Sequence, residues 1–170
     1  MITINYQGNN PTVAQATENA NQLLQDNNFF QQIASHPNFD LATATPSQVA
    51  SILQNSNFQM TVEFYKTLYP FSKALAYDDP AHPLTVHLNQ RRLNRSAASI
   101  CATIIHEAVH AADAMESNFS FGHSDNSSVG KQNTAPYWID NLAYTIISGG
   151  QPASIVFQHD LISNDIAIQA

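Results

Sequence analysis

The sequence predicts a small α+β domain, in which a short mixed sheet packs on a long helix and a helical region comes first. Three observations lead to this fold class. Residues 1–56 carry apolar residues at helical spacing, residues 58–89 alternate between apolar and polar side chains, and residues 97–117 form a long apolar-rich run at helical spacing. Helices and strands that are grouped along the chain, and do not alternate regularly, are typical of the α+β class.

The chain has 170 residues, which is the size of one domain with a core of its own. We expect residues 1–56 to form a helical lobe. Residues 57–170 then hold the strands, the long helix, a loop and a second helix. The lobe either completes the fold or covers a cleft as a pro-segment.

The N-terminal part is predicted to contain helices over residues 12–26, 29–34 and 46–54. Val13, Ala16 and Ala20 recur at helical spacing in the first of them. Thr45 can cap the third helix, and Pro46 suits its first position because proline is tolerated there.

Three strands are predicted next, over residues 58–67, 73–78 and 84–89. The first is rich in aromatic and β-branched residues, and the third alternates strictly. A turn over residues 79–83 separates the second and third strands, since the two prolines there disfavour helix in the residues before them.

A long helix is expected over residues 97–117, capped by Asn94 or Ser96. Its buried stripe is predicted to consist of Ile100, Ile104, Ala108, Ala111 or Ala112, and Met115. A loop over residues 118–134 follows, and a loop of this length is often functional. A helix over residues 135–148 comes next, and the last twenty residues are expected to form short strands or extended segments.

The charge pattern argues against nucleic acid as a partner. The formal net charge is −7, and the only basic run is Arg91, Arg92 and Arg95, which is too small for a phosphate track. We expect these arginines at a solvated strand end or in local salt bridges. No run approaches membrane-spanning length and no secretory signal is recognisable, so we expect a soluble protein that is cytoplasmic or exported by a non-classical or effector route.

The single cysteine, Cys101, excludes an internal disulfide. It lies within an apolar stretch, and we expect a small buried side chain there. A catalytic thiol would need a polarising histidine close in space.

The chemistry centres on the run His106-Glu107-Ala108-Val109-His110. A spacing of four residues on a helix places both imidazoles on one face, one turn apart, where two nitrogens can share a zinc ion. Glu107 lies at the flank of that face, within reach of a water molecule, and is the expected catalytic acid and base. The alternative is an amphipathic helix with two ordinary histidines.

A catalytic zinc site needs a third protein ligand, and His123 is the best candidate. It lies thirteen residues after His110, beyond the expected helix end, and Gly122 before it allows a close approach of the backbone. The other candidates are acidic residues: Asp113, Glu116, Asp125 and Asp140. Asp113 is expected to accept a hydrogen bond from an imidazole N–H of a ligand histidine.

These residues resemble the active-site helix of the zincin metallopeptidases. The likeness covers the helix around His106 to His110 and extends to the strand over residues 84–89, which in zincins forms the rim that holds an extended substrate. The run from Ile104 to Asp113 is similar to that of short bacterial effector zincins. Metzincins would have glycine at position 113 and a third ligand at position 116, and gluzincins would have a glutamate on a later helix, so the subfamily stays open.

The resemblance implies a zinc-dependent metallopeptidase that hydrolyses peptide bonds, with His106 and His110 as ligands, Glu107 as base and Tyr137 as the candidate for oxyanion stabilisation. It implies a protein or peptide substrate. We expect His87 to be a rim or surface residue. Two alternatives remain: a zinc amidase acting on a non-protein amide, such as one in a cell-wall peptide, and a non-catalytic binding module that zinc stabilises.

Overall fold

The computed structural model describes residues 1–68, 72, 74–77, 79, 81–122 and 130–150. It has mixed α and β content, as the sequence predicted. The elements, in chain order, are β1 (Thr3–Asn5), α1 (Pro11–Leu23), α2 (Asn27–Ala34), α3 (Pro46–Asn55), β2 (Gln59–Tyr65), β3 (Ala76–Tyr77), β4 (Thr85–Asn89), the 3-10 turn η1 (Gln90–Arg92), α4 (Ala97–Met115) and α5 (Ala135–Ile147).

The four strands form one mixed sheet in the order β1-β2-β4-β3. β1, β2 and β4 run parallel, and β3 pairs with β4 in the antiparallel direction. The sequence did not predict β1, because three residues are too few to show an alternating pattern. This strand precedes the three predicted helices, within the part of the chain that was expected to form a helical lobe.

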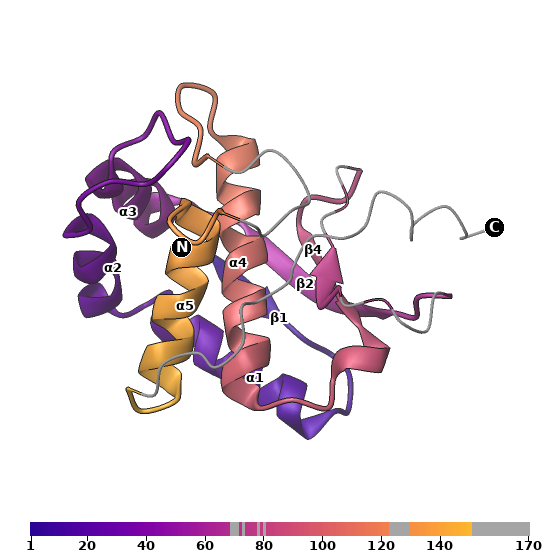
Figure 1. The fold of residues 1–170 in the computed structure, drawn as a ribbon. Helices are drawn as coiled ribbons and strands as arrows, with labels where there is room; N and C mark the ends of the chain where they lie inside the picture. Colours follow the sequence, from indigo (N-terminus) through magenta and orange to yellow (C-terminus); the bar gives the residue numbers. More distant parts are fainter. Residues whose placement is uncertain (69–71, 73, 78, 80, 123–129, 151–170) are drawn as a thin grey trace.

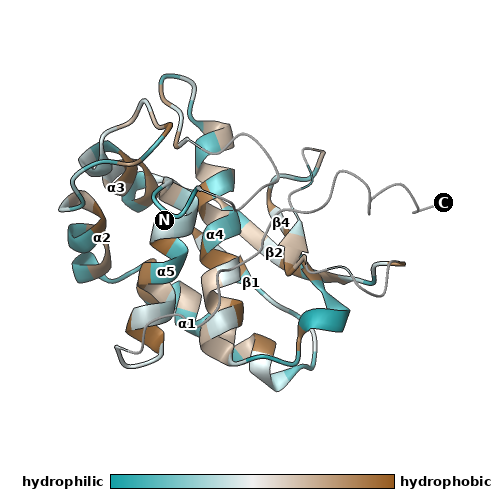
Figure 2. Cartoon of the chain, in the orientation of Figure 1, coloured by the Kyte–Doolittle hydropathy of each residue, from teal (hydrophilic) through white to brown (hydrophobic). Residues whose placement is uncertain are grey.

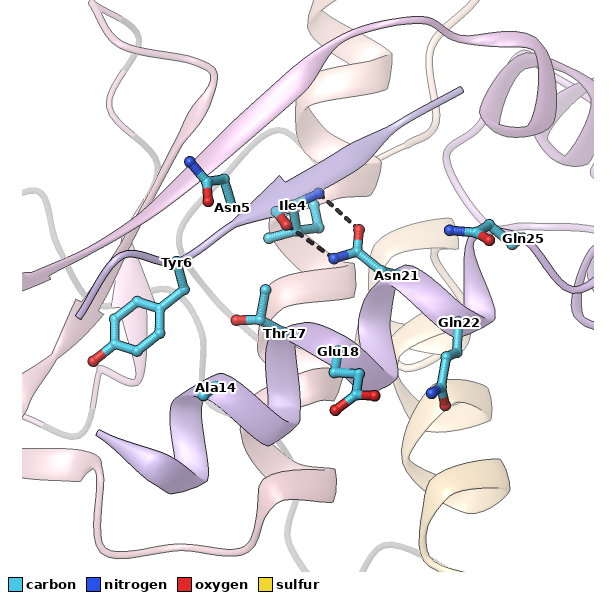
Figure 3. Close-up of a pocket in the computed structure, with 9 residues that line it drawn as sticks. All are labelled: Ile4, Asn5, Tyr6, Ala14, Thr17, Glu18, Asn21, Gln22 and Gln25. Atoms are coloured by element: carbon cyan, nitrogen blue, oxygen red, sulfur yellow. Dashed lines mark hydrogen bonds between the residues drawn. The ribbon is translucent and has the colours of Figure 1, made fainter. Parts of the chain in front are cut away.

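The outer edge of β1 is covered by a side chain of α1 (Figure 3). The Ile4 N–H donates to Asn21 Oδ1 at 2.8 Å, and Asn21 Nδ2 donates to the Ile4 carbonyl at 2.9 Å. The carboxamide therefore takes the place of a neighbouring strand at this edge, where unpaired backbone groups would otherwise attract another chain. An open groove of about 460 Å³ runs between β1 and α1 at this point.

The N-terminal helices begin where local capping predicts. The Asn10 side chain accepts the Thr12 and Val13 amides at the start of α1. Thr45 and Gln48 form a reciprocal capping box at the start of α3, which confirms the predicted N-cap. These bonds satisfy backbone donors that have no partner inside a helix.

α4 lies at the centre of the molecule, and α1 and α5 both pack on it (Figure 1). Ser96 caps it by accepting the Ser99 amide. The predicted positions 100, 104, 108, 111 and 112 are all buried. Met115 is 51% exposed, so its predicted place in the buried stripe is wrong. It lies in the last turn, beyond Ala112, the last buried residue of the helix.

One hydrophobic core joins the two parts of the chain. Val13 and Ala16 of α1, Phe29 of α2 and Val49 of α3 belong to the same buried cluster as Ile104 of α4. Residues 1–56 therefore contribute side chains to the core that surrounds the long helix.

The arginines of the basic run cross-link the backbone. Arg91 Nε donates to the Thr67 carbonyl at 3.1 Å, and Arg92 Nε donates to the Ser72 carbonyl at 2.8 Å. Arg91 and Arg92 directly follow β4, which agrees with the predicted strand end, and among the described residues none of the three arginines forms a salt bridge. The η1 turn that carries two of them is strongly hydrophilic (Figure 2).

The extended segments predicted for residues 151–170 lie outside the described residues. Within the part of the chain that the structure describes, no helix combines the length and the apolar character needed to span a membrane.

Cys101 is fully buried, and burial raises the pKa of its thiol to about 12. At pH 8 only about one thiol in ten thousand would then be a reactive thiolate. We expect a thiol reagent to label the folded protein at least about 100-fold more slowly than the urea-unfolded protein. Equal labelling rates in the two states would contradict the packing of α4.

Candidate metal centre

The imidazoles of His106 and His110 converge on α4, as their spacing predicted. Their Nε2 atoms lie 3.1 Å apart, and the ring centroids lie 4.8 Å apart at 64°. His106 is fully buried, whereas His110 is partly exposed. The two Nε2 atoms thus lie within hydrogen-bond distance of each other on one side of α4.

Asp140 of α5 fixes the orientation of His106. Its Oδ2 lies 2.8 Å from His106 Nδ1, and both side chains have no exposed surface. An ionised carboxylate can only accept, so His106 donates through Nδ1–H. A neutral His106 therefore presents its Nε2 lone pair towards His110, which is the arrangement that second-shell carboxylates impose on metal-binding histidines.

The spacing of the two nitrogens fits a shared metal ion. Two nitrogen ligands at about 2.0–2.1 Å from a tetrahedral zinc lie about 3.3 Å from each other. The observed separation of 3.1 Å differs from this value by a few tenths of an ångström. The donor set, two imidazoles backed by a carboxylate, also suits zinc.

Two further predicted residues lie beside the histidine pair. Glu107 is only 5% exposed, on the turn of α4 that carries His106. Tyr137 is in the first turn of α5, and its ring packs edge-on against His106 with 4.8 Å between centroids. The structure therefore places Tyr137 of α5 against His106, and Glu107 is buried in the same turn of α4 as His106.

The acidic candidates for the third ligand have other partners. Asp140 is bound to the Nδ1 side of His106, away from Nε2. Glu116 accepts the backbone N–H of Asn118, which holds the pKa of its carboxyl below the usual range. Asp113 accepts the backbone N–H of Phe121 at 3.0 Å. Asp140 makes a contact of this kind with His106 Nδ1, and the imidazole contact expected for Asp113 stays a prediction.

His123 and Asp125 lie outside the described residues. Within the described ranges, no three histidine, cysteine, aspartate or glutamate side chains gather into a group that could hold a metal. The described part of the site is thus a pair of nitrogens with a carboxylate behind one of them.

The sequence did not predict the role of Asp140. One signal was present: Asp140 is the only charged residue of α5, a helix that is otherwise uncharged and mostly apolar. A single acid at a buried position of such a helix requires a partner, because an unpaired buried charge is costly. Which partner it has depends on how α4 and α5 pack.

The predicted rim strand is not at an edge. β4 pairs with β2 on one side and with β3 on the other. His87 of β4 is half-buried and stacks on Tyr77 of β3, with 4.4 Å and 6° between the rings. Edge positions in this part of the sheet belong to β3.

No protein-family model matches this chain, and neither a curated protein nor a solved structure matches it.

Asp140→Ala is expected to destabilise the fold, because it leaves the buried His106 Nδ1–H without its acceptor. We expect the free energy of unfolding to fall by about 3 kcal/mol. Urea denaturation measures it. Asp26→Ala is the matched control, since Asp26 accepts a backbone N–H at an exposed N-cap, and it should cost only about 1 kcal/mol. Equal losses in both variants would contradict the special role of the buried pair.

Burial lowers the pKa of His87 below its ordinary value of 6.5. The unfolded state therefore binds more protons than the folded state as pH falls through about 6.5, and stability is lost on the acidic side. We expect His87→Phe, which preserves a ring stack, to show a smaller drop in Tm between about pH 7.5 and about pH 5.5 than wild type. A His87→Phe drop as large as that of wild type would refute the assignment.

Proposed function

We propose that this protein is a zinc-dependent metallopeptidase of the zincin type, which hydrolyses peptide bonds in a protein or peptide substrate. The observation that carries the proposal is the convergence of His106 and His110, whose Nε2 atoms are 3.1 Å apart, with Asp140 holding His106 from behind. Two imidazole nitrogens 3.1 Å apart, one of them on a ring held by a buried carboxylate, form a site suited to a cation.

His106 and His110 would hold the zinc, and we propose His123 as the third ligand. Gly122, the residue before it, is placed by the fold beside the 40–42 backbone. With three protein ligands a zinc site keeps a position open for water or substrate, which distinguishes catalytic from structural sites.

Glu107 is the proposed general base and acid. Zinc, when bound, polarises the scissile carbonyl and lowers the pKa of a water molecule towards neutrality. Glu107 takes a proton from the attacking water while the water oxygen forms a bond to the carbonyl carbon. The same carboxyl group then gives that proton to the leaving nitrogen as the C–N bond breaks.

Tyr137 is the proposed donor to the oxyanion. Its ring, at the start of α5, packs against His106, which is one of the proposed zinc ligands. The phenolic O–H is carried by that ring. A phenolic O–H can donate a hydrogen bond to an oxygen on which negative charge develops.

The two alternative functions are separated by activity. A zinc amidase would use the same residues on a non-protein amide, so a panel of peptide and cell-wall substrates discriminates it from a peptidase. A zinc-stabilised binding module would lose stability on chelation and have no turnover to lose.

Zinc content tests the proposal directly. We expect desalted wild-type protein to carry about one zinc per chain, and His106→Ala and His123→Ala to lose it, because each removes one of three ligands. Plasma emission spectrometry measures the metal. His82→Ala, at a histidine paired with Asp79 on the surface, should keep the zinc. Wild-type protein that stays free of zinc after incubation with it would refute the proposal.

Glu107→Gln separates metal binding from catalysis. The variant should keep its zinc, since Glu107 is not a ligand. It should lose turnover by about 100-fold or more, because an amide cannot accept the proton. Hydrolysis of a fluorogenic peptide library measures turnover, and undiminished activity in this variant would exclude Glu107 as the base.

A further inference from the structure

The guanidinium of Arg95 lies against the face of α4 that carries the histidine pair. Its Nη1 donates to Thr103 Oγ1 at 2.7 Å and to the Ser99 carbonyl at 3.1 Å. Residues three or four apart on a helix share one face, so Thr103 lies on the same side of α4 as His106 and His110. The guanidinium is therefore about one helical turn from the histidine pair, along the same side of the helix.

The protein uses only part of the hydrogen-bonding capacity of Arg95. Nε donates to the Arg92 carbonyl at 3.0 Å, and Nη1 is occupied by Ser99 and Thr103. Nη2 is buried, and no acceptor for it exists in the part of the chain that the structure describes. Arginine has N–H donors on each guanidinium nitrogen. The donors of Nη2 are thus left for an acceptor that these residues do not supply.

The charge of Arg95 also lacks a counter-charge. The ion pairs among the described residues join His82 to Asp79 and His106 to Asp140, and neither includes Arg95. Burial lowers the pKa of Arg95 to about 10, so the side chain is still cationic at neutral pH. A cation that is shielded from water and has no anionic partner is costly to the fold. An anion bound from outside would offset that cost.

The surroundings of Arg95 favour an anion. The chain carries a formal net charge of −7, yet four of its 6 lysines and arginines lie between the ends of β2 and β4 and the start of α4. These four are Lys66, Arg91, Arg92 and Arg95. The printed bonds of the Arg91 and Arg92 side chains go to backbone carbonyls, so their charges are not neutralised by these contacts. This corner is therefore positive within an acidic protein, and such a corner attracts anions.

We propose that Arg95 binds a carboxylate group of the substrate through Nη2 and makes the protein prefer acidic peptides. This inference rests on the proposed function and names its substrate class. The Arg95 side chain is partly exposed, so a small rotation of its end opens Nη2 to a ligand. The planar edge of a guanidinium matches the two oxygens of a carboxylate.

The distance along α4 limits where the carboxylate lies in the peptide. One helical turn is about 5.4 Å long, and an extended peptide advances by about 3.3 Å per residue. The carboxylate would therefore lie within about three residues of the bond that is cleaved. It belongs either to a glutamate or aspartate side chain or to the C-terminus of the peptide.

The test is the ratio of kcat/KM for peptides that carry glutamate or glutamine at each position near the cleaved bond. We expect glutamate to be favoured by about 10- to 100-fold at one position. Arg95→Met should bring that ratio to about 1, because methionine keeps an apolar stem and loses the charge. Amidation of the peptide C-terminus separates the two sources, since it removes the preference only where the terminal carboxylate is bound.

Arg91→Met is the matched control, since Arg91 is an exposed arginine of the same corner whose Nε donates to the Thr67 carbonyl. It should keep the acid preference. Circular dichroism records whether Arg95→Met folds. Where it does not, Arg95→Lys decides, and the preference should fall at least about threefold in that variant because lysine lacks the planar fork.

Binding is also measured without turnover, as the Tm of the zinc-free protein in succinate against chloride of equal ionic strength. Succinate should raise the Tm of wild type by about 2 °C or more, since a ligand that binds only the folded state stabilises it. The rise should be absent in Arg95→Met, or smaller in Arg95→Lys, and preserved in Arg91→Met.

The outcomes separate this inference from the proposed function. Peptides cleaved at equal rates with glutamate and glutamine at every position overturn the inference and leave the proposed function standing. An acid preference that survives in folded Arg95→Met overturns it as well. An Arg95-dependent succinate shift without hydrolysis of any peptide supports the carboxylate site and overturns the peptidase proposal alone. Neither hydrolysis nor a succinate shift overturns both.

Discussion

The hydrogen bond between His106 and Asp140 crosses the interface of the two central helices, and both side chains are completely buried. A buried carboxylate without a donor would be costly, so α5 is stable against α4 only in the position that joins these two groups. That position also sets the direction of the His106 lone pair. The same contact therefore fixes a helix–helix packing arrangement and the orientation of a potential metal ligand.

The polar face of α4 depends on partners from other elements. Ser99, Thr103, His106 and His110 recur every three or four residues and form one stripe on a helix whose other residues are mostly apolar and buried. At the N-terminal end of the stripe, Arg95 Nη1 donates to Thr103 Oγ1 at 2.7 Å and to Ser99. Burial lowers the pKa of Arg95 to about 10. In the middle of the stripe, Asp140 supplies the acceptor for His106. Polar residues inside a core are tolerated only with such partners.

The N-terminal part of the chain contributes to the core and to the surroundings of the histidine pair. β1 extends the sheet, α1 packs on α4, and the 36–44 loop binds the backbone at Ser120 and Asn133. Removing residues 1–56 would expose buried residues of α4 and break the main-chain bonds to residues 120 and 133.

The sequence by itself determined the features that depend on local geometry. Helix boundaries followed from capping residues such as Thr45 and Ser96, and the convergence of His106 and His110 followed from 3.6 residues per turn. Only the tertiary structure decided which distant groups meet. Asp140 is 34 residues from His106 in the sequence. β1 is a strand because it pairs with β2. Met115 is exposed because it lies beyond Ala112, the last buried residue of α4. Periodicity records which face of an element is apolar, and it carries no information on which side chain of another element lies opposite. The third ligand depends on such a long-range encounter, so His123 stays a prediction.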